Sequence, residues 1–305
     1  MLHDADPAGR YDATLPPPIR TLASSASRMS SYSSQPPPGR MQPLSHWSAA
    51  SRRALIGVFT DIDDTLTTEG AITADALRAM AALRASGLHL IAITGRPAGW
   101  SEPFACTWPL DAIVAENGAV ALLPRSGGGV EKRYQQDAPT RAANFERMQQ
   151  VLRLIECEVP GARRAADSAG RECDIAIDHS EFTQLDEARI EAVATLMRSE
   201  GMHATVSSIH VNGWYGGHDK LEGARWIVRE LWGRALDDES ERWAYVGDST
   251  NDALMFAHFS HSIGVANVRR FERALPQLPR YVAPSERGAG FAEVAQAILD
   301  AITER

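Results

Sequence analysis

The 305-residue sequence has few cysteines, no basic run and no long apolar stretch. Three cysteines are too few for a disulfide framework, and no CxxC or Cys/His cluster indicates structural zinc. Lys and Arg number 31 against 39 Asp and Glu, and this net charge of −8 disfavours nucleic-acid binding. A membrane helix needs about 20 consecutive apolar residues, whereas the longest clean apolar stretches here are strand-sized. GxxxxGK and GxGxxG motifs are also absent, so a nucleotide-binding loop has no support. We expect a cytoplasmic protein without nucleic-acid or membrane partners.

The first 52 residues lack the patterns of folded structure. They hold eight of the 17 prolines, are rich in serine, and carry a charge of +2 that leaves −10 on the rest. Proline triplets at 16–18 and 36–38 block helix and strand. Such a composition buries too little surface to offset the entropy of ordering, so we predict a disordered tail over residues 1–52. An arginine- and serine-rich stretch also resembles a transit peptide, but the acidic residues at its start argue against that interpretation.

From residue 53 the pattern changes to short apolar runs that alternate with segments of helical spacing. The apolar runs are residues 54–60, 88–93 and 112–115. Apolar strands joined by helices indicate a parallel sheet covered on both faces. The same rhythm returns near residue 215. We therefore predict an α/β fold with a Rossmann-like three-layer core, built from residues 53–125 and 215–305.

Residues 126–214 follow a different pattern. Two predicted helices, over residues 138–158 and 186–200, alternate with two pairs of short strands. This order predicts an antiparallel sheet backed by two helices, which is an α+β unit inserted into the core. We expect the insert to act as a mobile cap, or lid, that closes over a substrate and excludes water.

An acidic cluster ends the first apolar run, where Asp61, Asp63 and Asp64 lie within four residues. Ligands of open α/β sheets bind at the carboxyl ends of strands, so chemistry is expected there. Clustered carboxylates repel one another unless a cation neutralises them. Oxygen ligands without thiol or imidazole favour Mg²⁺. An acidic helix cap or turn is the alternative interpretation.

A second acidic motif follows a later apolar strand and contains Asp248 and Asp252. Asp248 at the strand tip can join the same metal, and Asp252, one helical turn further on, can lie behind it. The polar residues between them also cap helices well, so a capping motif is the alternative.

Two weaker signals complete the set. Thr94 and Gly95 end a strand before a predicted helix, where a hydroxyl and backbone N–H groups form an anion site. Lys220 begins a helix, which is unfavourable for the helix dipole and suggests a functional reason. Taken singly, a plain turn and a solvated lysine explain them equally well.

In this order, the four motifs resemble those of the haloacid dehalogenase superfamily of phosphotransferases. The resemblance covers roughly residues 54–303. Residues 61–65, Thr94, Lys220 and residues 247–252 look like its first, second, third and fourth motifs. Residues 116–119 and the short insert are similar to sugar-phosphate phosphatases with a type 2B cap, of the mannosyl-3-phosphoglycerate, sucrose-phosphate and trehalose-phosphate phosphatase type.

The resemblance implies a Mg²⁺-dependent phosphatase that hydrolyses a small phosphorylated sugar or related phosphomonoester through an aspartyl-phosphate intermediate. Asp61 would be the nucleophile, and Asp63 the general acid and base. The metal ligands would come from Asp61, the backbone carbonyl of Asp63, and Asp248, with Asp252 behind them. The residues that would hold the phosphoryl oxygens are Thr94, Gly95, Lys220 and Asn251.

Several alternatives stay open at this point. A sugar phosphomutase would share every motif, because it differs only in whether the phosphoryl group passes to sugar or to water. A phosphoacceptor signalling domain lacks the second acidic motif and the insert, and a silent binding protein would not need the full motif set. Specificity is expected from the insert. The candidates are His210, Asn212, Trp214, Tyr215, Arg171, Glu172 and Asp174. Either a monomer or a homodimer fits the sequence.

Overall fold

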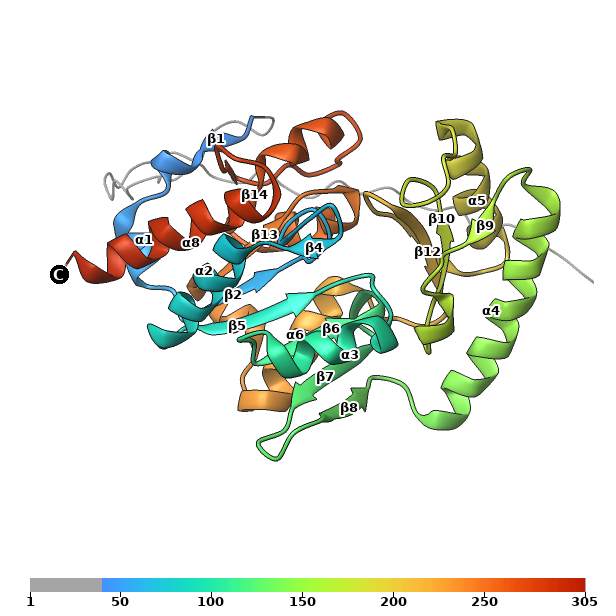
Figure 1. Ribbon diagram of the computed structural model, residues 1–305, viewed down its shortest axis with the longest axis horizontal. Helices are drawn as coiled ribbons and strands as arrows, with labels where there is room; N and C mark the ends of the chain where they lie inside the picture. Colours follow the sequence, from blue (N-terminus) through green and yellow to red (C-terminus); the bar gives the residue numbers. More distant parts are fainter. Residues whose placement is uncertain (1–39, 305) are drawn as a thin grey trace, which may run out of the picture. The chain divides into compact units, whose positions relative to one another are not determined.

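The computed structural model describes residues 40–304, so the part of the predicted tail before residue 40 lies outside the described residues. Within them, a nine-stranded sheet and a four-stranded sheet organise the chain (Figure 1). A two-stranded hairpin, β3 (Thr67–Thr68) and β4 (Ala71–Ile72), follows the first acidic motif. The short 3-10 helices are η1 (Leu44–His46), η2 (Glu116–Gly118), η3 (Ser168–Gly170), η4 (Leu236–Arg242), η5 (Thr250–Asp252) and η6 (Ala266–Phe271).

The nine-stranded sheet is mostly parallel. Its strands, in spatial order, are β1 (Gln42–Pro43), β15 (Tyr281–Val282), β14 (His261–Gly264), β13 (Trp243–Gly247), β2 (Gly57–Thr60), β5 (His89–Ile93), β6 (Ala112–Ala115), β7 (Val120–Pro124) and β8 (Val130–Tyr134). The strands from β1 to β6 in this order run parallel, and β7 and β8 are antiparallel to their neighbours. The predicted α/β core is therefore confirmed.

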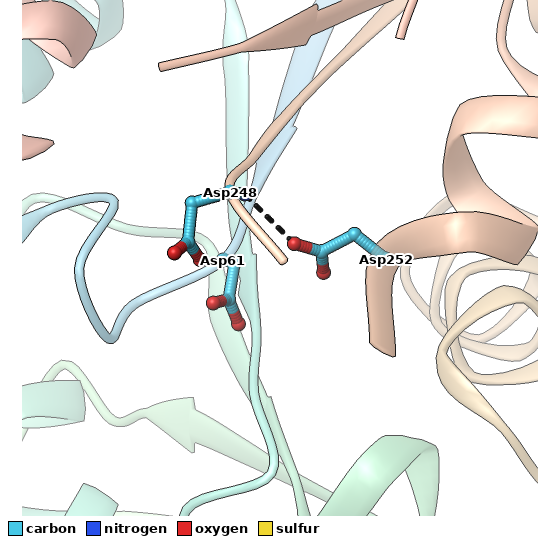
Figure 2. A group of neighbouring side chains, drawn as sticks. All are labelled: Asp61, Asp248 and Asp252. Atoms are coloured by element: carbon cyan, nitrogen blue, oxygen red, sulfur yellow. Dashed lines mark hydrogen bonds between the residues drawn. The ribbon is translucent and has the colours of Figure 1, made fainter. Parts of the chain in front are cut away.

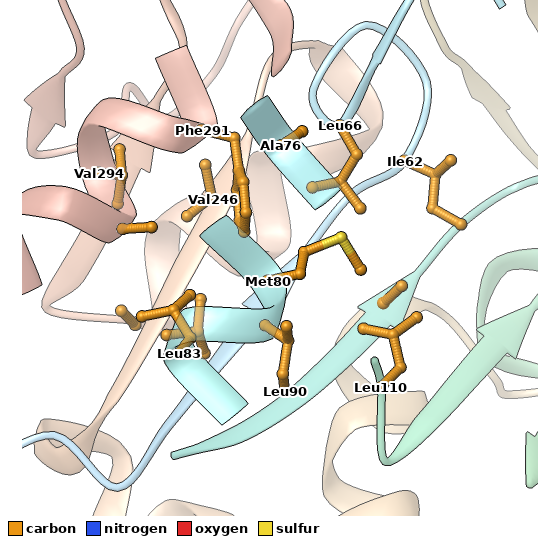
Figure 3. Packing of buried hydrophobic residues seen from close by; sticks show 14 of the residues in the cluster. Ile62, Leu66, Ala76, Met80, Leu83, Leu90, Leu110, Val246, Phe291 and Val294 are labelled. Atoms are coloured by element: carbon orange, nitrogen blue, oxygen red, sulfur yellow. The ribbon is translucent and has the colours of Figure 1, made fainter. Parts of the chain in front are cut away.

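Helices cover both faces of this sheet. One face carries α2 (Ala74–Ala85), α3 (Ala98–Thr107) and α8 (Arg287–Thr303), and the other carries α6 (Lys220–Trp232) and α7 (Ala253–His258). The short helix α1 (Ala49–Arg53) lies on α8. On the first face, Met80 of α2 and Phe291 of α8 pack with Val246 of β13 (Figure 3). Neighbouring residues of β2 serve opposite faces, since Val58 belongs to this core and Phe59 to the other. Burial on both sides explains why the strands read as continuous apolar runs.

The insert has its own sheet and its own apolar core. Its strands, in spatial order, are β11 (His203–Val206), β12 (His210–Trp214), β10 (Ile175–Asp178) and β9 (Arg163–Arg164), all antiparallel. Helices α4 (Ala138–Glu158) and α5 (Glu187–Ser199) pack against this sheet (Figure 1). Each helix begins at an aspartate whose carboxylate accepts a backbone N–H of the first turn, Asp137 for α4 and Asp186 for α5. The predicted antiparallel sheet with two helices is confirmed.

The tail prediction is wrong for residues 40–52. Strand β1 pairs with β15, and Trp47 is buried against Tyr281 with ring centroids 5.8 Å apart. Helix α1 lies on α8, where the Nε of Arg53 donates to the carbonyl of Ala301 at 2.9 Å. The proline- and serine-rich average of the whole segment concealed Leu44 and Trp47, which are buried in the core of the large sheet and tie this stretch to it.

The predicted boundary of the insert is also wrong. Strand β8 pairs with β7 in the large sheet, so residues 126–134 belong to the core and the insert begins after Tyr134. The glycines at 127–129 form the turn of this hairpin and do not mark a domain linker. Within residues 40–304, no helix is both long enough and apolar enough to cross a membrane.

Candidate active site

Parallel pairing brings the chemistry-bearing motifs to one edge of the large sheet. Strand β2 lies between β13 and β5, and Thr60 pairs with both Val246 and Ala92. The residues that follow these strands therefore leave the sheet side by side. Asp61 follows β2, Asp248 follows β13, and Thr94 follows β5.

Three carboxylates gather there with one ammonium group, and we name Asp61, Asp248, Asp252 and Lys220 the aspartate cluster. All four side chains are buried, and one oxygen of each carboxylate lies within 4.8 Å of the others (Figure 2). The Nζ of Lys220 donates to Oδ1 of Asp61 at 2.8 Å and to Oδ1 of Asp252 at 2.7 Å. The cluster thus holds more negative than positive charge in a site shielded from water.

Burial of this surplus charge changes the pKa values of the cluster. Burial, aided by Asp252 and Asp63, raises the pKa of Asp61 to about 7, although Lys220 acts against the shift. Burial and the other aspartates also raise the pKa of Asp248 well above its usual range. Burial alone would lower the pKa of Lys220, but Asp252 and Asp61 outweigh it and raise that pKa. A cation bound to the carboxylates would relieve the repulsion.

The hydrogen bonds divide the three aspartates into two kinds. Asp252 has both oxygens engaged, because Oδ1 accepts from Lys220 and Tyr245 while Oδ2 accepts the N–H groups of Asp248 and Ser249. Among the described residues, Oδ2 of Asp61 accepts no hydrogen bond. Oδ1 of Asp248 receives only the distant hydroxyl of Thr65 at 3.4 Å. Asp252 therefore orients the loop from behind, and the donor atoms left for a metal are carboxylate oxygens, which suit Mg²⁺.

A small cavity lies between this edge of the core and the insert. Its volume is about 10 Å³, which is room for roughly one water molecule. Its walls are formed on the core side by Asp61, Asp63, Gly95, Arg96 and Asn251, and on the insert side by Ser207, Ser208, Ile209, His210 and Asn212. The insert and the core therefore lie too close together at this point to leave room for a larger ligand.

The Asp63 carboxylate faces a guanidinium. The Nε of Arg96 donates to both oxygens of Asp63, at 2.9 and 3.0 Å, and the Arg96 side chain is almost fully buried. The same guanidinium donates to Glu181 at 2.8 Å and to Asp167 at 3.2 Å, and both of these carboxylates belong to the insert. Arg96 thus connects Asp63 of the core to two acidic groups of the insert.

The predicted phosphate-binding residues occupy different positions. Gly95 and Asn251 line the cavity, and Lys220 contacts Asp61. Thr94 is fully buried beside the cavity, and its hydroxyl accepts the N–H of Arg96 at 3.0 Å. All the predicted residues therefore lie at the same edge of the sheet, with Thr94 holding the turn that carries Gly95.

A second group of buried polar residues joins the insert to the core, and we name Glu116, Asn117, Arg171, Asp174 and Asn212 the docking cluster. The Glu116 carboxylate accepts four backbone N–H groups, those of Ala98, Glu172, Cys173 and Asp174. Arg171 donates to Oδ1 of Asp174 at 2.7 Å and to the carbonyl of Gly95 at 3.0 Å. The side-chain amides of Asn117 and Asn212 both donate to Asp174.

The backbone at Glu116 is itself unusual. Glu116 and Asn117 have φ values of 50° and 54°, a left-handed conformation that non-glycine residues seldom adopt. Burial and Asp174 raise the pKa of Glu116 to about 8, while its N–H donors and Arg171 act against this shift. The left-handed turn directs the Glu116 carboxylate toward the insert. The hydrogen bonds that this carboxylate accepts there offset the backbone strain of the turn.

Only two of the insert residues expected to set specificity line the cavity. Arg171 and Asp174 belong to the docking cluster, and the Glu172 carboxylate accepts from Lys132 and Tyr134. His210 and Asn212 line the cavity. Trp214 and Tyr215 do not, since the indole N–H of Trp214 donates to the carbonyl of His218 and the Tyr215 hydroxyl donates to that of Glu200. Their place in the insert core corrects the expectation that they could face the site.

Two residues of the site were missed by the sequence motifs. Asn267 donates from Nδ2 to Oδ2 of Asp248 at 2.9 Å, and the Tyr245 hydroxyl donates to Asp252. Asn267 follows β14, the neighbour of β13, so a polar residue just beyond a third strand end was the available signal. Tyr245 alternates with apolar residues inside β13 and gives no such signal.

Comparison with known proteins agrees with this geometry. Residues 58–144 match the family model of haloacid dehalogenase-like hydrolases. Among curated proteins, no sequence matches the chain. The match to the family model confirms the predicted resemblance over residues 58–144, and many solved structures share the fold of the chain.

Three of these structures show how far the likeness extends. A HAD/COF-like hydrolase from Plasmodium vivax has a TM-score of 0.59 at 16% identity and covers 83% of this chain and 98% of its own. The sucrose-phosphatase of Synechocystis, solved with sucrose and phosphate, has a TM-score of 0.58 at 17% identity, covering 81% and 98%. The C-terminal domain of C. albicans trehalose-6-phosphate phosphatase has a TM-score of 0.59 at 13% identity, covering 83% and 95%. At these identities, the likeness shows the shared fold.

Proposed function

We propose that this protein is a Mg²⁺-dependent phosphatase that hydrolyses a small phosphorylated sugar or related phosphomonoester through an aspartyl-phosphate intermediate. The observation that carries the proposal is the aspartate cluster, in which Asp61 and Asp248 follow adjacent strands and Lys220 bridges the carboxylates of Asp61 and Asp252. Asp63, two residues after Asp61, shares one cavity with it. A nucleophile, an acid and a cation site therefore meet at one point.

The first half of the reaction transfers the phosphoryl group to the protein. An oxygen of Asp61 attacks phosphorus, and the bond between phosphorus and the alkoxide oxygen breaks. Asp63 gives its proton to that leaving oxygen, so the alcohol departs uncharged. In the second half, Asp63 takes a proton from water, which attacks the aspartyl phosphate. Inorganic phosphate leaves, and the Asp61 carboxylate and protonated Asp63 are restored.

The remaining residues hold the reacting groups in place. Lys220, the Gly95 N–H and Asn251 would bind the phosphoryl oxygens, with Thr94 supporting the turn. Asp61, the backbone carbonyl of Asp63, and Asp248 would hold Mg²⁺, with Asp252 and Asn267 orienting them. When bound, Mg²⁺ neutralises negative charge on the carboxylates and the phosphoryl group. Positioning and charge neutralisation supply most of what phosphoryl transfer requires.

The fold and the small cavity support the rest of the proposal. Structures of a sucrose-phosphatase and a trehalose-6-phosphate phosphatase share the fold, which favours a sugar phosphate as substrate. The insert would open to admit it and close to exclude water, because the closed cavity holds about one water molecule. We propose that the enzyme works in the cytoplasm on this small-molecule substrate, as a monomer or a homodimer and without nucleic-acid or membrane partners.

The test is a phosphate-release assay with p-nitrophenyl phosphate and a panel of sugar phosphates. We expect many turnovers per enzyme molecule with Mg²⁺ and none with EDTA. Asp63→Asn should still form the phosphoenzyme from p-nitrophenyl phosphate, whose leaving group needs no acid, but should turn over slowly. A single turnover in the wild type would indicate a phosphoacceptor domain and would contradict the proposal.

A further inference from the structure

The guanidinium of Arg96 is shared between the core and the insert. On the core side, its Nε donates to both oxygens of Asp63, and Nη2 lies 2.9 Å from one of them. On the insert side, Nη2 donates to Oε1 of Glu181 at 2.8 Å, and Nη1 donates to Oδ2 of Asp167 at 3.2 Å. A guanidinium binds phosphate oxygens through pairs of such N–H groups. Carboxylates of the insert therefore occupy an edge of Arg96 that could bind a phosphate.

These two insert carboxylates do not depend on Arg96 alone. Oδ1 of Asp167 accepts from Nε and Nη2 of Arg171, at 3.2 and 3.0 Å. Oε2 of Glu181 lies 3.0 Å from Nε2 of His210. Both of these partners belong to the insert and would move with it. Outward movement of the insert would thus leave Asp167 and Glu181 paired.

Arg96 has no comparable second set of partners. Besides the three carboxylates, its guanidinium lies over the ring of Trp100, 4.8 Å from the ring centroid. Nη1 donates only to Asp167 and Glu181 among the described residues. Outward movement of the insert would leave this nitrogen without an acceptor, beside the cavity that Arg96 lines together with Asp61. A cation that loses its partners in a largely buried position favours the binding of another anion.

The second cation of the site stays engaged when the insert moves. The Nζ of Lys220 donates to Asp61 at 2.8 Å and to Asp252 at 2.7 Å, and all three residues belong to the core. Four core carboxylates surround Lys220 and Arg96, those of Asp61, Asp63, Asp248 and Asp252. A bound Mg²⁺ would balance the two negative charges in excess. A phosphoryl group would then enter a site without surplus negative charge, in which Arg96 is the cation that opening releases.

We infer that Arg96 binds the phosphoryl group of the entering substrate, and that Asp167 and Glu181 hold the same guanidinium when the insert is closed. The insert thus competes with the substrate for one cation. This inference rests on the proposed function and deepens it, because it adds a phosphate-binding residue to the site. A closed form that occupies its own binding group lowers the apparent affinity, since only the open fraction of the protein can bind.

The experiment uses inorganic phosphate, which carries the phosphoryl charge without a leaving group. Calorimetric titration into the wild-type protein with Mg²⁺ gives the dissociation constant. Glu181→Gln removes one competing carboxylate with little change of shape, so phosphate should bind about three- to tenfold more tightly. Glu191→Gln removes an exposed carboxylate of the same insert, where it pairs with Arg198, and should leave the dissociation constant unchanged. Unchanged or weaker binding by Glu181→Gln would overturn the inference.

A charge-balanced variant separates phosphate binding by Arg96 from mere fastening of the insert. Arg96→Gln combined with Glu181→Gln removes one charge of each sign and also removes the contact between insert and core. If Arg96 only fastened the insert, this protein would bind phosphate as tightly as Glu181→Gln does. We expect binding at least about tenfold weaker than in Glu181→Gln, because the pair of N–H donors is lost. Equal binding by the two proteins would contradict the role given to Arg96.

Two further measurements keep the outcomes distinct. Arg96→Lys keeps the positive charge but loses the paired donors, and it replaces the double variant if circular dichroism shows that the latter is unfolded. It should bind phosphate several-fold more weakly than the wild type, and tighter binding would overturn the inference. Hydrolysis of p-nitrophenyl phosphate is measured in parallel. Its absence would overturn the proposed function alone, whereas a wild-type protein that binds no phosphate would overturn the inference.

Discussion

The aspartate cluster and the docking cluster are both groups of buried charges at the same edge of the sheet, yet their polar atoms are satisfied to different degrees. In the docking cluster the carboxylate of Glu116 accepts four N–H groups, and Asp174 accepts from Arg171 and two asparagines. In the aspartate cluster, Asp61 and Asp248 keep oxygens that accept little from the protein. The carboxylates of the docking cluster thus have their hydrogen-bond partners within the protein. The aspartate cluster keeps carboxylate oxygens that a cation could bind.

The difference teaches how buried charge is used in one molecule. A network in which every group has partners contributes to folding and to the closed position of the insert. A buried cluster with surplus negative charge lowers the stability of the fold, because its carboxylates repel one another. Such clusters are typical of functional sites, where a bound cation can neutralise the charge. Both clusters meet at the loop of residues 94–96, where Gly95 lines the cavity and its carbonyl accepts from Arg171.

Replacing Asp61, the proposed nucleophile, should have the largest effect. Asp61→Asn keeps the shape of the side chain but cannot form an aspartyl phosphate, so phosphate release should fall by at least about 10³-fold. Circular dichroism and melting temperature should show a folded protein, because the change also removes buried negative charge. Substantial residual turnover would contradict the catalytic role that we assign to the aspartate cluster.

Removing Glu116 should instead damage the fold. Glu116→Ala leaves four buried N–H groups without an acceptor, which should lower the free energy of unfolding by about 3 kcal/mol or more. Urea denaturation measures the loss, and hydrogen exchange at residues 172–174 should accelerate first. The exposed control Glu191→Ala should change stability by less than about 0.5 kcal/mol. A comparable loss of unfolding free energy in Glu116→Ala and Glu191→Ala would contradict the structural role assigned to the docking cluster.

Removing Asn267 should weaken the metal site without disturbing the insert. Asn267→Ala deletes the donor to Oδ2 of Asp248, and loss of such an orienting bond typically lowers metal affinity by about 10- to 100-fold. Activity titrated with Mg²⁺ gives the apparent affinity. Asn144→Ala, which loses a bond to Gln136 within the insert, serves as the control and should not shift the titration.

The smallest predicted effect is on the pH dependence of stability. The pKa of Asp61 is raised to about 7 in the folded protein, so the folded state binds this proton more tightly than the unfolded chain does. Without metal, the stability associated with protonated Asp61 is lost as pH rises through about 7. Mg²⁺ competes with that proton, so its effect on Tm should be small at pH 5 and larger at pH 8. A Tm increase that does not grow with pH would contradict the surplus charge assigned to the aspartate cluster.

Sequence reasoning located the elements and residues whose signals are local. Helix α4 and strand β6 begin and end where predicted, because apolar spacing, caps and turns mark them within the segment itself. The aspartates were found because parallel strands that end in carboxylates must deliver them to one edge. These signals depend on near neighbours in the chain.

The features that were missed depend on distant partners. The charged residues 131–133 of β8 do not alternate as a half-buried strand should, and only pairing with β7 makes them one. Trp47 is buried only because Tyr281 and His261 are brought beside it by the sheet. The contacts of Arg96 with Asp167 and Glu181 span more than 70 residues, so no spacing in the sequence could indicate them.

The two margins of the nine-stranded sheet have a consequence for solubility. An unpaired strand edge is a template for aggregation, and proteins blunt it with short strands, proline or charge. At one margin β1 is two residues long and ends in Pro43, and at the other β8 carries Glu131, Lys132 and Arg133 in succession. A truncation that begins after Pro43 would uncover β15 and remove this protection. We therefore expect such a truncated chain to aggregate even where its active site is intact.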